Sequence, residues 1–468
     1  MTETRTDAKR PRPTRASSSR RVAYDIIAAV RESDAYANLL LPARLAEAGL
    51  DAADSALATE LTYGTLRGLG RYDRVIELAA GRPTHKIDVE VLDVLRLGVH
   101  QLLSTRIPPH AAVDESVQLV VALGRRSASG FVNGVLRSIA RKPPETWLAE
   151  SVEGLTGEAR LAMEHSHPRW IVEAFRAALS AEGRADELDE LLHADNVPPA
   201  VSLVALPGLA EPADVGRAGT VSPVAVRSPG GDPRALPLVA SGRVRVQDEG
   251  SQLAALALSR ARPIRAGERW LDLCAGPGGK AALLAAEALR GGAKLTANEL
   301  IPARAGLVRN ALAVFEAPPV VLEGDGARFG TGDGAQAPGR YDRILLDAPC
   351  TGLGALRRRP EARWRKQPGD LAELTPLQGR LLDAAIDALA PGGILAYVTC
   401  SPHLAETREA VEAALTRHPA LRTVDTGEVV SRIATSDLEL PDGTAVQLWP
   451  HRHGTDAMFI QLLTTLDS

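Results

Sequence analysis

The sequence predicts an all-α domain followed by an α/β domain with a Rossmann-like, doubly wound parallel sheet. Between about residues 20 and 141, apolar side chains recur every three or four positions, which is the period of a helix. From Arg269 onward, short apolar runs alternate with helical patterns, as in a parallel sheet whose strands are joined by helices. A glycine-rich turn at 274–280 follows the first of these runs.

The first domain is expected to contain several short helices. Their apolar faces are predicted at 22–30, 91–103, 113–121 and 131–139. Pro108-Pro109 separates the second helix from the third, and Pro143-Pro144 marks the end of the domain. We therefore predict a disordered basic tail over 1–19, the all-α domain over 20–144, a linker or small intermediate domain over 145–240, and the α/β domain over 241–468.

Four stretches of the first domain carry a resemblance to a known family. They are Thr59–Arg67 (TELTYGTLR), Leu95–Leu103 (LRLGVHQLL), Ile107–Glu115 (IPPHAAVDE) and Phe131–Arg137 (FVNGVLR). In order and spacing they resemble the NusB family of RNA-binding antitermination factors. The resemblance implies an RNA-docking module without chemistry of its own. Asn133 and Arg137, one helical turn apart, are candidates to face RNA, with a cap or plain surface role left open.

Composition excludes several classes of protein. Only 3 cysteines occur among 468 residues, which excludes a disulfide framework and indicates a reducing compartment. No apolar run reaches the roughly 18 residues that a membrane span needs, and the Arg- and Ser-rich N-terminus lacks the apolar segment of a signal peptide. We expect a cytoplasmic monomer. His165 and His167 precede a proline, a pattern more typical of a turn than of a metal site, and we expect no metal.

The five predicted strands of the second domain all end in polar or reactive residues. The strands are expected at 270–273, 293–297, 320–322, 343–346 and 394–398. They lead, in that order, to Cys274, Asn298-Glu299, Gly324-Asp325, Asp347–Cys350 and Thr399–Ser401. Ligands of doubly wound sheets bind at the carboxyl ends of the strands. We therefore expect these residues to surround one ligand site.

The glycine-rich turn fits neither of two familiar phosphate-binding motifs. A P-loop would need glycine at Cys274 and a hydroxyl side chain at Ala281, and the dinucleotide fingerprint would need glycine at Ala281. Glycines at such a turn let backbone N–H groups approach a ligand at the positive end of a helix dipole. A nucleoside cofactor without a pyrophosphate, S-adenosylmethionine (SAM), fits this pattern. A plain structural turn is the alternative.

Two acidic residues at strand ends are candidates for holding the nucleoside. Glu299 lies roughly 20 residues past the glycine turn, where a carboxylate can accept hydrogen bonds from both ribose hydroxyls. Asp325 is placed to accept from the adenine amino group. Either residue could instead be a solvated loop acid. Their positions at successive strand ends favour the cofactor interpretation.

The two cysteines after the fourth and fifth strands suggest the reaction. A free cysteine is usually a small buried hydrophobe, but Cys350 and Cys400 both follow strand ends. A thiolate beside a SAM site suits a substrate carbon that is a poor nucleophile, such as carbon 5 of a pyrimidine. Addition of the thiolate to carbon 6 makes carbon 5 nucleophilic, and a second group can assist release. Asp347 could bond the ring nitrogen 3 edge.

Three motifs of the second domain also resemble a known family. They are Asp272–Lys280 (DLCAGPGGK), Asp347–Gly354 (DAPCTGLG) and Tyr397–Pro402 (YVTCSP). They resemble the RNA cytosine-5 methyltransferases of the Sun/Fmu type. Together with the NusB-like domain, the resemblance narrows to the RsmB type, which acts on bacterial small-subunit (16S) rRNA.

This resemblance implies roles for individual residues. Cys400 would be the nucleophile and Cys350 would assist product release. In DNA cytosine-5 methyltransferases the cysteine after proline attacks instead, so this assignment rests on the family. The residues implied to line the SAM site are Cys274, Ala275, Gly276, Pro277, Gly278, Gly279, Lys280, Glu299, Asp325 and Asp347.

The sequence departs from the family pattern in three places. Gly276 stands where the family commonly has a second alanine, and Glu299 stands where an aspartate is more usual. Asp456–Phe459 (DAMF) replaces the common Asp-Gly-Phe-Phe. None of these changes removes the nucleophile or the cofactor turn.

A basic run follows the Pro-Cys motif. Residues 357–366 contain a tryptophan among arginines, which favours phosphate contact and base stacking over a merely solvated surface. The predicted RNA-binding residues are Arg358, Arg359, Trp364 and Arg365. A target base must leave its stack to reach a thiolate, so a loop or bulge of RNA is the expected substrate. A DNA cytosine-5 methyltransferase and a non-catalytic RNA-binding or antitermination factor are the alternatives.

Overall fold

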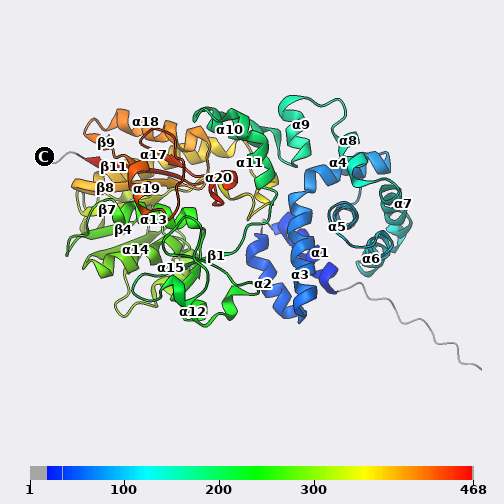
Figure 1. The fold of residues 1–468 in the computed structure, drawn as a ribbon, viewed down its shortest axis with the longest axis horizontal. Coiled ribbons are helices and arrows are strands. Elements are labelled where there is room, and N and C mark those ends of the chain that lie inside the picture. The colour runs from blue at the N-terminus through cyan, green and yellow to red at the C-terminus, as the bar shows by residue number, and fades with distance from the viewer. Residues whose placement is uncertain (1–17, 34, 466–468) are drawn as a thin grey trace, which may run out of the picture. The chain divides into compact units, whose positions relative to one another are not determined.

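The protein is represented by a computed structural model that describes residues 18–33 and 35–465 (Figure 1). Apart from its last two residues, the predicted basic tail lies outside the described residues. The chain forms two compact units: the first ends at Arg169 and also takes in Arg359–Glu361, and the second holds Trp170–Arg358 and the chain from Ala362 onward. No described helix has the length and apolar character needed to cross a membrane.

The first unit is helical, as predicted. Its longer helices are α1 (Ser18–Ser33), α2 (Ala37–Ala48), α3 (Ala52–Arg67), α4 (Leu69–Ala80), α5 (Val89–Ser104), α6 (Pro109–Ala122), α7 (Ser129–Ala140), α8 (Pro144–Ser151) and α9 (Gly157–Glu164). Their apolar faces meet in one core that includes Ile26, Leu61 and Leu136. Asp51 and Asp88 begin α3 and α5, because their side chains accept hydrogen bonds from backbone N–H groups of the first turn. The four helices predicted from the sequence lie within α1, α5, α6 and α7.

Gly64 shows why two of the sequence motifs of this unit occur together. A Cβ atom at Gly64 would lie 2.1 Å from Cε1 of His100 on α5. The His100 ring is buried, and the Tyr72 hydroxyl lies 2.9 Å from its Nδ1 atom. Glycine in α3 therefore makes room for a histidine that α5 and α4 hold in place.

Residues 145–169 complete the first unit. Trp147 of α8 is buried and its Nε1 donates to the carbonyl oxygen of Ile139 at 2.9 Å. The two clustered histidines form a turn, in which Nδ1 of His167 lies 2.8 Å from the carbonyl oxygen of His165. Among the described residues, no group of three or more His, Cys, Asp or Glu side chains is arranged to hold a metal ion.

The second unit begins with two helices and a small antiparallel sheet. The elements are α10 (Arg169–Ser180), α11 (Leu188–Ala194), β1 (Ser202–Ala205), β2 (Ala225–Arg227), α12 (Pro237–Ala240) and β3 (Val244–Val246). The strand order is β2-β1-β3, with Val204 opposite Arg245. Strand β3 is thus an edge of this small sheet, and its Val244 packs with Leu203 and Val226 in the apolar core of the sheet.

A larger mixed sheet follows. Its strands are β4 (Arg269–Asp272), β5 (Lys294–Glu299), β6 (Val320–Glu323), β7 (Tyr341–Asp347), β8 (Leu389–Thr399), β9 (Leu421–Thr423), β10 (Val446–Gln447) and β11 (Phe459–Thr465). The order is β10-β11-β8-β7-β4-β5-β6, with β9 beside β11. Strands β8, β7, β4, β5 and β6 are parallel, and β11 is antiparallel to β8. The five predicted strands are these five parallel strands.

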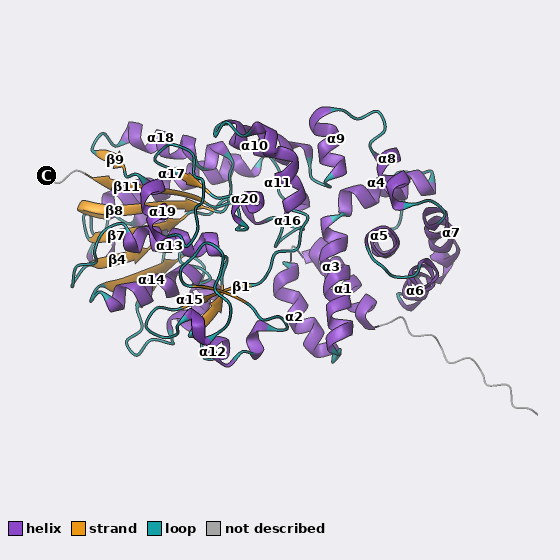
Figure 2. Cartoon of the chain, in the orientation of Figure 1, coloured by secondary structure: helices purple, strands orange, loops and turns teal. Residues whose placement is uncertain are grey.

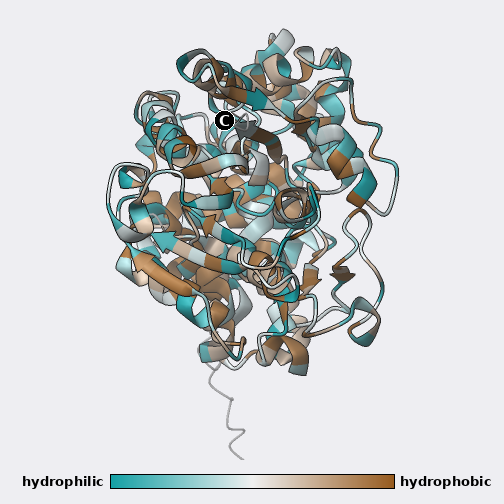
Figure 3. Cartoon of the chain, turned by 90° about the vertical axis from the view of Figure 1, so that its left-hand side faces the viewer, coloured by the Kyte–Doolittle hydropathy of each residue, from teal (hydrophilic) through white to brown (hydrophobic). Residues whose placement is uncertain are grey.

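Helices cover both faces of the larger sheet (Figure 2). They are α13 (Glu249–Arg260), α14 (Gly279–Arg290), α15 (Pro302–Leu312) and α19 (Thr426–Ile433) in one apolar core, and α17 (Asp370–Ala388) and α18 (Arg408–Arg417) in the other. Trp270 of β4 belongs to the first core and Leu271 to the second, because successive residues of a strand point to opposite faces. Apolar residues, brown in Figure 3, run through the strands and the helices that pack on them.

The strand order places a ligand site at one edge of this sheet. From β4 the chain moves outward to β5 and β6, and it then returns to β7 on the other side of β4. Doubly wound sheets bind ligands at the carboxyl ends of the strands where the order reverses in this way. The ends of β4, β5, β7 and β8 therefore face one region.

Candidate active site

The glycine-rich turn joins β4 to α14 and is tied to the end of β5. The backbone N–H of Gly276 donates to Glu299 Oε2 at 3.0 Å, and the Arg304 guanidinium donates to the Gly276 carbonyl oxygen at 2.8 Å. Gly278 has a φ of 105°, a conformation that favours glycine, and a Cβ there would lie 2.6 Å from the Ala311 Cβ. The turn therefore keeps its backbone close to α15 and holds Glu299 beside it.

Two departures from the family pattern are explained by one contact. A Cβ atom at Gly276 would lie 2.3 Å from Glu299 Oε2. The second Glu299 oxygen, Oε1, accepts from the Ile301 backbone N–H at 3.0 Å, so the carboxylate is held at both oxygens. The longer glutamate thus occupies the space that an alanine at Gly276 would need.

We expect the effects of changing these two residues to be non-additive. Gly276→Ala should weaken SAM binding about 10-fold because it displaces the Glu299 carboxylate, and adding Glu299→Asp should restore much of the loss, since aspartate is one methylene shorter. Calorimetric titration with SAM of the wild type, both single variants and the double variant measures the coupling. Gly306→Ala, with nothing within 4 Å of its new Cβ, is the control. Simple addition of the two losses would contradict this interpretation.

Acidic groups gather around the turn. Asp272, at the end of β4, is fully buried, and burial together with the nearby Asp347 carboxylate raises its pKa to about 8, whereas Lys280 acts in the opposite direction. Lys280, in the first turn of α14, donates from Nζ to Asp347 Oδ2 at 2.8 Å. Burial opposes the Lys280 charge, but Asp347 and then Cys400 raise its pKa above the ordinary value. Carboxylates at Glu299 and Asp347 suit a cofactor that carries a sulfonium charge, and the residues present therefore fit SAM.

Asp325 follows β6, beside the Glu299 strand end. Residues Glu299 and Glu323 are directly paired in the β5–β6 register. The Asp325 side chain is exposed and accepts from the Ala327 backbone N–H at 2.9 Å. Its contact with adenine stays a prediction.

The structure brings Cys350 and Cys400 together. They follow the ends of the neighbouring parallel strands β7 and β8, and their Sγ atoms lie 3.5 Å apart. The neighbouring Cys400 sulfur and burial raise the Cys350 pKa well above the ordinary value, so Cys350 keeps its proton. Because electrostatic interactions are mutual, the Lys280 charge favours a thiolate at Cys400. The pair therefore consists of a thiol at Cys350 beside Cys400, whose role as the nucleophile stays a prediction.

Comparisons with known proteins place this site in a family. Residues 262–464 match the family model of the 16S rRNA methyltransferase RsmB/F, and residues 17–141 match the NusB family. Over 411 residues, 85% of this chain and 90% of the relative, the protein is 35% identical to the ribosomal RNA small subunit methyltransferase B of Salmonella newport (strain SL254). The chain belongs to the RsmB/F family of 16S rRNA methyltransferases.

Membership of the RsmB/F family makes the protein a SAM-dependent rRNA methyltransferase. It confirms the predicted family, the α/β fold with its NusB-like helical domain, and the cofactor. It also argues against the alternative of a non-catalytic antitermination factor. The chain is also 48% identical to a protein of Mycobacterium tuberculosis (strain ATCC 25618 / H37Rv) that is named as a methyltransferase, with no substrate in the name. The match covers 97% of this chain and 98% of that relative.

Two solved structures share the fold of this RsmB/F family member. The crystal structure of PH0851 has a TM-score of 0.77 and 21% sequence identity, and the match covers 96% of this chain and 98% of that chain. A methyltransferase homologue from Pyrococcus horikoshii has a TM-score of 0.51 and 21% identity over 66% of this chain and 99% of its own. These likenesses concern the fold alone.

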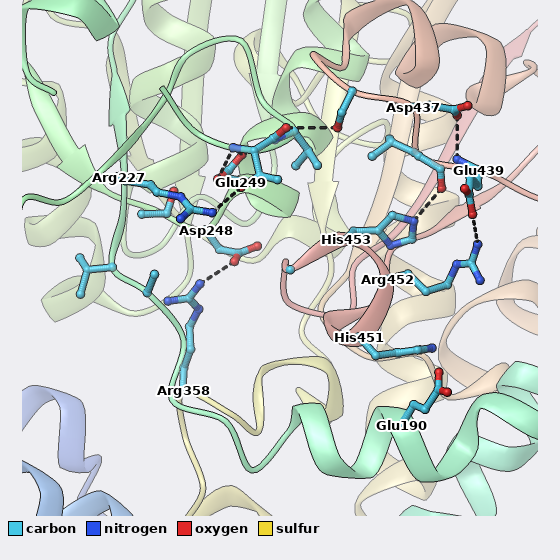
Figure 4. Close-up of a pocket in the computed structure, with 18 of the residues that line it drawn as sticks. Glu190, Arg227, Asp248, Glu249, Arg358, Asp437, Glu439, His451, Arg452 and His453 are labelled. Atoms are coloured by element: carbon cyan, nitrogen blue, oxygen red, sulfur yellow. Dashed lines mark hydrogen bonds and ion pairs between the residues drawn. The ribbon is translucent and has the colours of Figure 1, made fainter. Parts of the chain in front are cut away.

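The predicted RNA-binding run of this RsmB/F protein is largely engaged within the chain. Arg358 donates to Asp248 at 2.7 Å (Figure 4). It also donates to Asp456 at 2.9 Å. The Arg359 guanidinium lies 5.3 Å from the centre of the Tyr36 ring, within the first unit. Trp364 and Arg365, both half-buried, lie on the short helix α16 (Ala362–Arg365). RNA contact by these four residues stays a prediction.

A polar cavity of about 560 Å³ lies beside this run (Figure 4). Its lining includes Asp248, Glu249, Arg358 and Arg452, and none of the three cysteines. Glu249 accepts from the backbone N–H groups of Thr220, Val221 and Ser222, so it holds the surrounding loop. The cavity is therefore distinct from the cysteine site.

Sequence reasoning assigned no role to two residues that shape the cysteine site. Gly354, after the Pro-Cys motif, donates from its N–H to the Cys400 carbonyl oxygen at 2.8 Å, and its own carbonyl accepts from the Ala457 N–H at 2.8 Å. Glu406, six residues after Cys400, is fully buried and accepts from the Thr351 backbone N–H at 2.8 Å. Gly354 closes the Asp347–Gly354 motif, but its spacing gave no sign of this contact, and Glu406, four residues past the Tyr397–Pro402 motif, resembles any acidic residue after a strand.

Proposed function

We propose that the protein transfers the methyl group of SAM to carbon 5 of a cytosine in small-subunit (16S) rRNA, through a covalent bond between Cys400 and the base. Family membership supports the rRNA substrate, and the Salmonella relative is named for the small subunit. The observation that carries the covalent mechanism is the 3.5 Å contact between the Cys350 and Cys400 sulfur atoms at the ends of β7 and β8. An rRNA substrate also agrees with the predicted cytoplasmic location.

Cys400 acts first in this mechanism. Its thiolate forms a bond to carbon 6 of the cytosine, and the electrons of the carbon 5–carbon 6 double bond move toward carbon 5. Lys280 favours the thiolate before attack. Asp347 uses Oδ2 for Lys280, and its other oxygen is the acceptor that we assign to the amino group on the nitrogen 3 edge of the base. SAM, when bound by the turn, Glu299 and Asp325, supplies an electrophilic methyl group for carbon 5.

Cys350 acts in the release step. Once the bond to carbon 6 forms, the Cys400 sulfur no longer carries the charge that raises the Cys350 pKa. Cys350 can then give up its proton to solvent and accept the proton of carbon 5. The electron pair of that carbon–hydrogen bond restores the double bond, and the bond between carbon 6 and Cys400 breaks to return a thiolate.

RNA contacts near the site are assigned to the basic run. Arg359 is exposed, and Trp364 and Arg365 lie half-buried on α16, and we assign phosphate contact and base stacking to these three residues. A phosphate at Arg358 would have to compete with Asp248 and Asp456. We therefore expect Arg358 to contribute less to RNA binding than the exposed Arg359.

Release of the carbon 5 hydrogen tests the proposed chemistry. We expect 16S rRNA transcripts with tritium at carbon 5 of cytosine to release tritium into water in proportion to methyl groups incorporated from labelled SAM, because methylation at carbon 5 replaces that hydrogen. The Cys400→Ala variant is the control and should release none. Methyl incorporation into RNA without tritium release would overturn the carbon 5 assignment.

A further inference from the structure

A buried carboxylate links the two cysteine-bearing turns. Glu406 lies in the short helical turn Leu404–Glu406, which follows the Thr-Cys motif, and its side chain is fully buried. The Glu406 carboxylate accepts from the Thr351 backbone N–H through Oε1 and from the Thr351 hydroxyl through Oε2. The residue next to Cys350 therefore gives both of its donors to one carboxylate.

The same carboxylate reaches the other side of Cys350 through Gln378. The Gln378 amide, fully buried on α17, donates to Glu406 Oε1 at 3.1 Å and to the Pro349 carbonyl oxygen at 2.8 Å. The residues on each side of Cys350 are thus fixed by one network. Charge-assisted hydrogen bonds of this kind, in a buried setting, are stronger and more directional than neutral ones.

The network also extends to the residue after Cys400. The Ser401 hydroxyl lies 3.0 Å from the Thr351 hydroxyl. Since the Thr351 proton points to Glu406, Ser401 donates to Thr351. A line of hydrogen bonds therefore runs from Ser401 through Thr351 to Glu406 and connects the two turns. The carboxylate itself accepts from Thr351 and Gln378, which hold the Cys350 turn.

Resting on the function proposed above, we propose that Glu406 is a positioning residue for Cys350 in the release step. It holds the Pro349-Cys350-Thr351 turn so that the Cys350 sulfur stays beside the bond that must break. Its charge is also one of the influences that keep a proton on Cys350 until Cys400 has reacted, after the larger effects of Cys400 itself and burial. The Glu406 carboxylate accepts from Thr351 and Gln378, which hold the residues on each side of Cys350, so we expect its effect on the reaction to pass through Cys350.

The test is a comparison of adduct formation with adduct release. Glu406→Gln keeps the shape of the side chain but turns an amide group toward the donors of Thr351 and Gln378. We expect release of methylated RNA to slow about 10- to 100-fold and a covalent protein–RNA band to accumulate, while the rate of adduct formation changes by less than about 3-fold. Glu409→Gln, the same change at an exposed position three residues later, is the matched control and should release RNA as the wild type does.

A second pair of variants, at Thr351, tests the proposal even if Glu406→Gln fails to fold. Thr351→Val removes the hydroxyl and should slow release in the same direction, and Thr351→Ser, which keeps the hydroxyl, should restore it. Because Glu406 acts through Cys350, Glu406→Gln should add nothing to the adduct yield of Cys350→Ala. Equal slowing of adduct formation and release, or a further change in the Cys350→Ala background, would overturn the proposal.

Failure of this proposal and failure of the proposed function give different results. If Cys350→Ala traps an adduct and Glu406→Gln behaves as the wild type does, the role of Glu406 is wrong and the mechanism stands. If neither the wild type nor Cys350→Ala forms an adduct with 16S rRNA, the proposed function itself is wrong.

Discussion

Cys350→Ala is expected to give a protein–RNA band that survives a denaturing gel, whereas Cys400→Ala should give neither the band nor methylated RNA. Removing Cys400 removes the nucleophile, and we expect methyl transfer to fall by about 10⁴-fold or more. Removing Cys350 leaves the bond between Cys400 and carbon 6 able to form but slow to break. The measurement is incubation with labelled SAM and 16S rRNA transcript, followed by denaturing electrophoresis of the RNA and the protein.

The charges around the pair decide which cysteine should attack. Both sulfurs lie at strand ends, and a distance of 3.5 Å between them gives neither an advantage. Lys280, held by Asp347 at 2.8 Å, interacts with Cys400, whereas Cys350 is surrounded by influences that raise its pKa. A thiolate is the reactive form of cysteine, so the structure favours Cys400 on physical grounds that the spacing of the motifs does not contain.

Cys274→Ala is the control for loss of a thiol. Cys274 lies in the cofactor turn, and burial raises its pKa far above the ordinary value, with a further contribution from Asp272. The Cys274→Ala variant is therefore expected to slow the reaction without trapping a protein–RNA adduct. A trapped band with Cys400→Ala, and none with Cys350→Ala, would show that the two cysteines have the opposite roles.

The parts of the fold that the sequence predicts are those encoded by local periodicity. The run Trp270–Leu273 is largely apolar because β4 is covered on both faces, and β5, β7 and β8 were predictable for the same reason. The polar residues that close these strands share one edge, because parallel strands end together. Cys350 and Cys400 could therefore be placed near each other although 50 residues separate them.

What could not be predicted depends on contacts between distant segments. The strand at Val244–Val246 has the pattern of a strand, but only its pairing with β1 shows that it belongs to the small sheet. Arg358 has the composition of an RNA-binding residue, and only the structure shows that Asp248 and Asp456 already bind it. Glu406 looks like any acidic residue after a strand until its partners on Thr351 and Gln378 are known.

Gly354→Ala is expected to cause the largest loss of activity among changes that leave every reactive group in place. A Cβ atom at Gly354 would lie 2.0 Å from the Ala457 carbonyl oxygen and 2.9 Å from that of Cys400. Both obstacles are backbone atoms, which cannot rotate away as a flexible side chain can. We expect methyl transfer to fall by about 100-fold, since a displacement of about 1 Å at a reacting group has effects of this size.

The measurement combines single-turnover methyl transfer with thermal unfolding, because overpacking of this kind also costs about 1–3 kcal/mol of stability. Gly369→Ala is the control, since nothing lies within 4 Å of its new Cβ and its backbone at φ −64° accepts alanine. The new Cβ atom pushes on both the Cys400 carbonyl oxygen and the Asp456–Phe459 segment, and so displaces the Cys400 turn. Adduct formation should therefore fail in Gly354→Ala, whereas Glu406→Gln should still form the adduct. Normal adduct formation by Gly354→Ala would show that the Cys400 turn can shift without losing its reactivity, and the tight backbone contact would then have no part in placing the nucleophile.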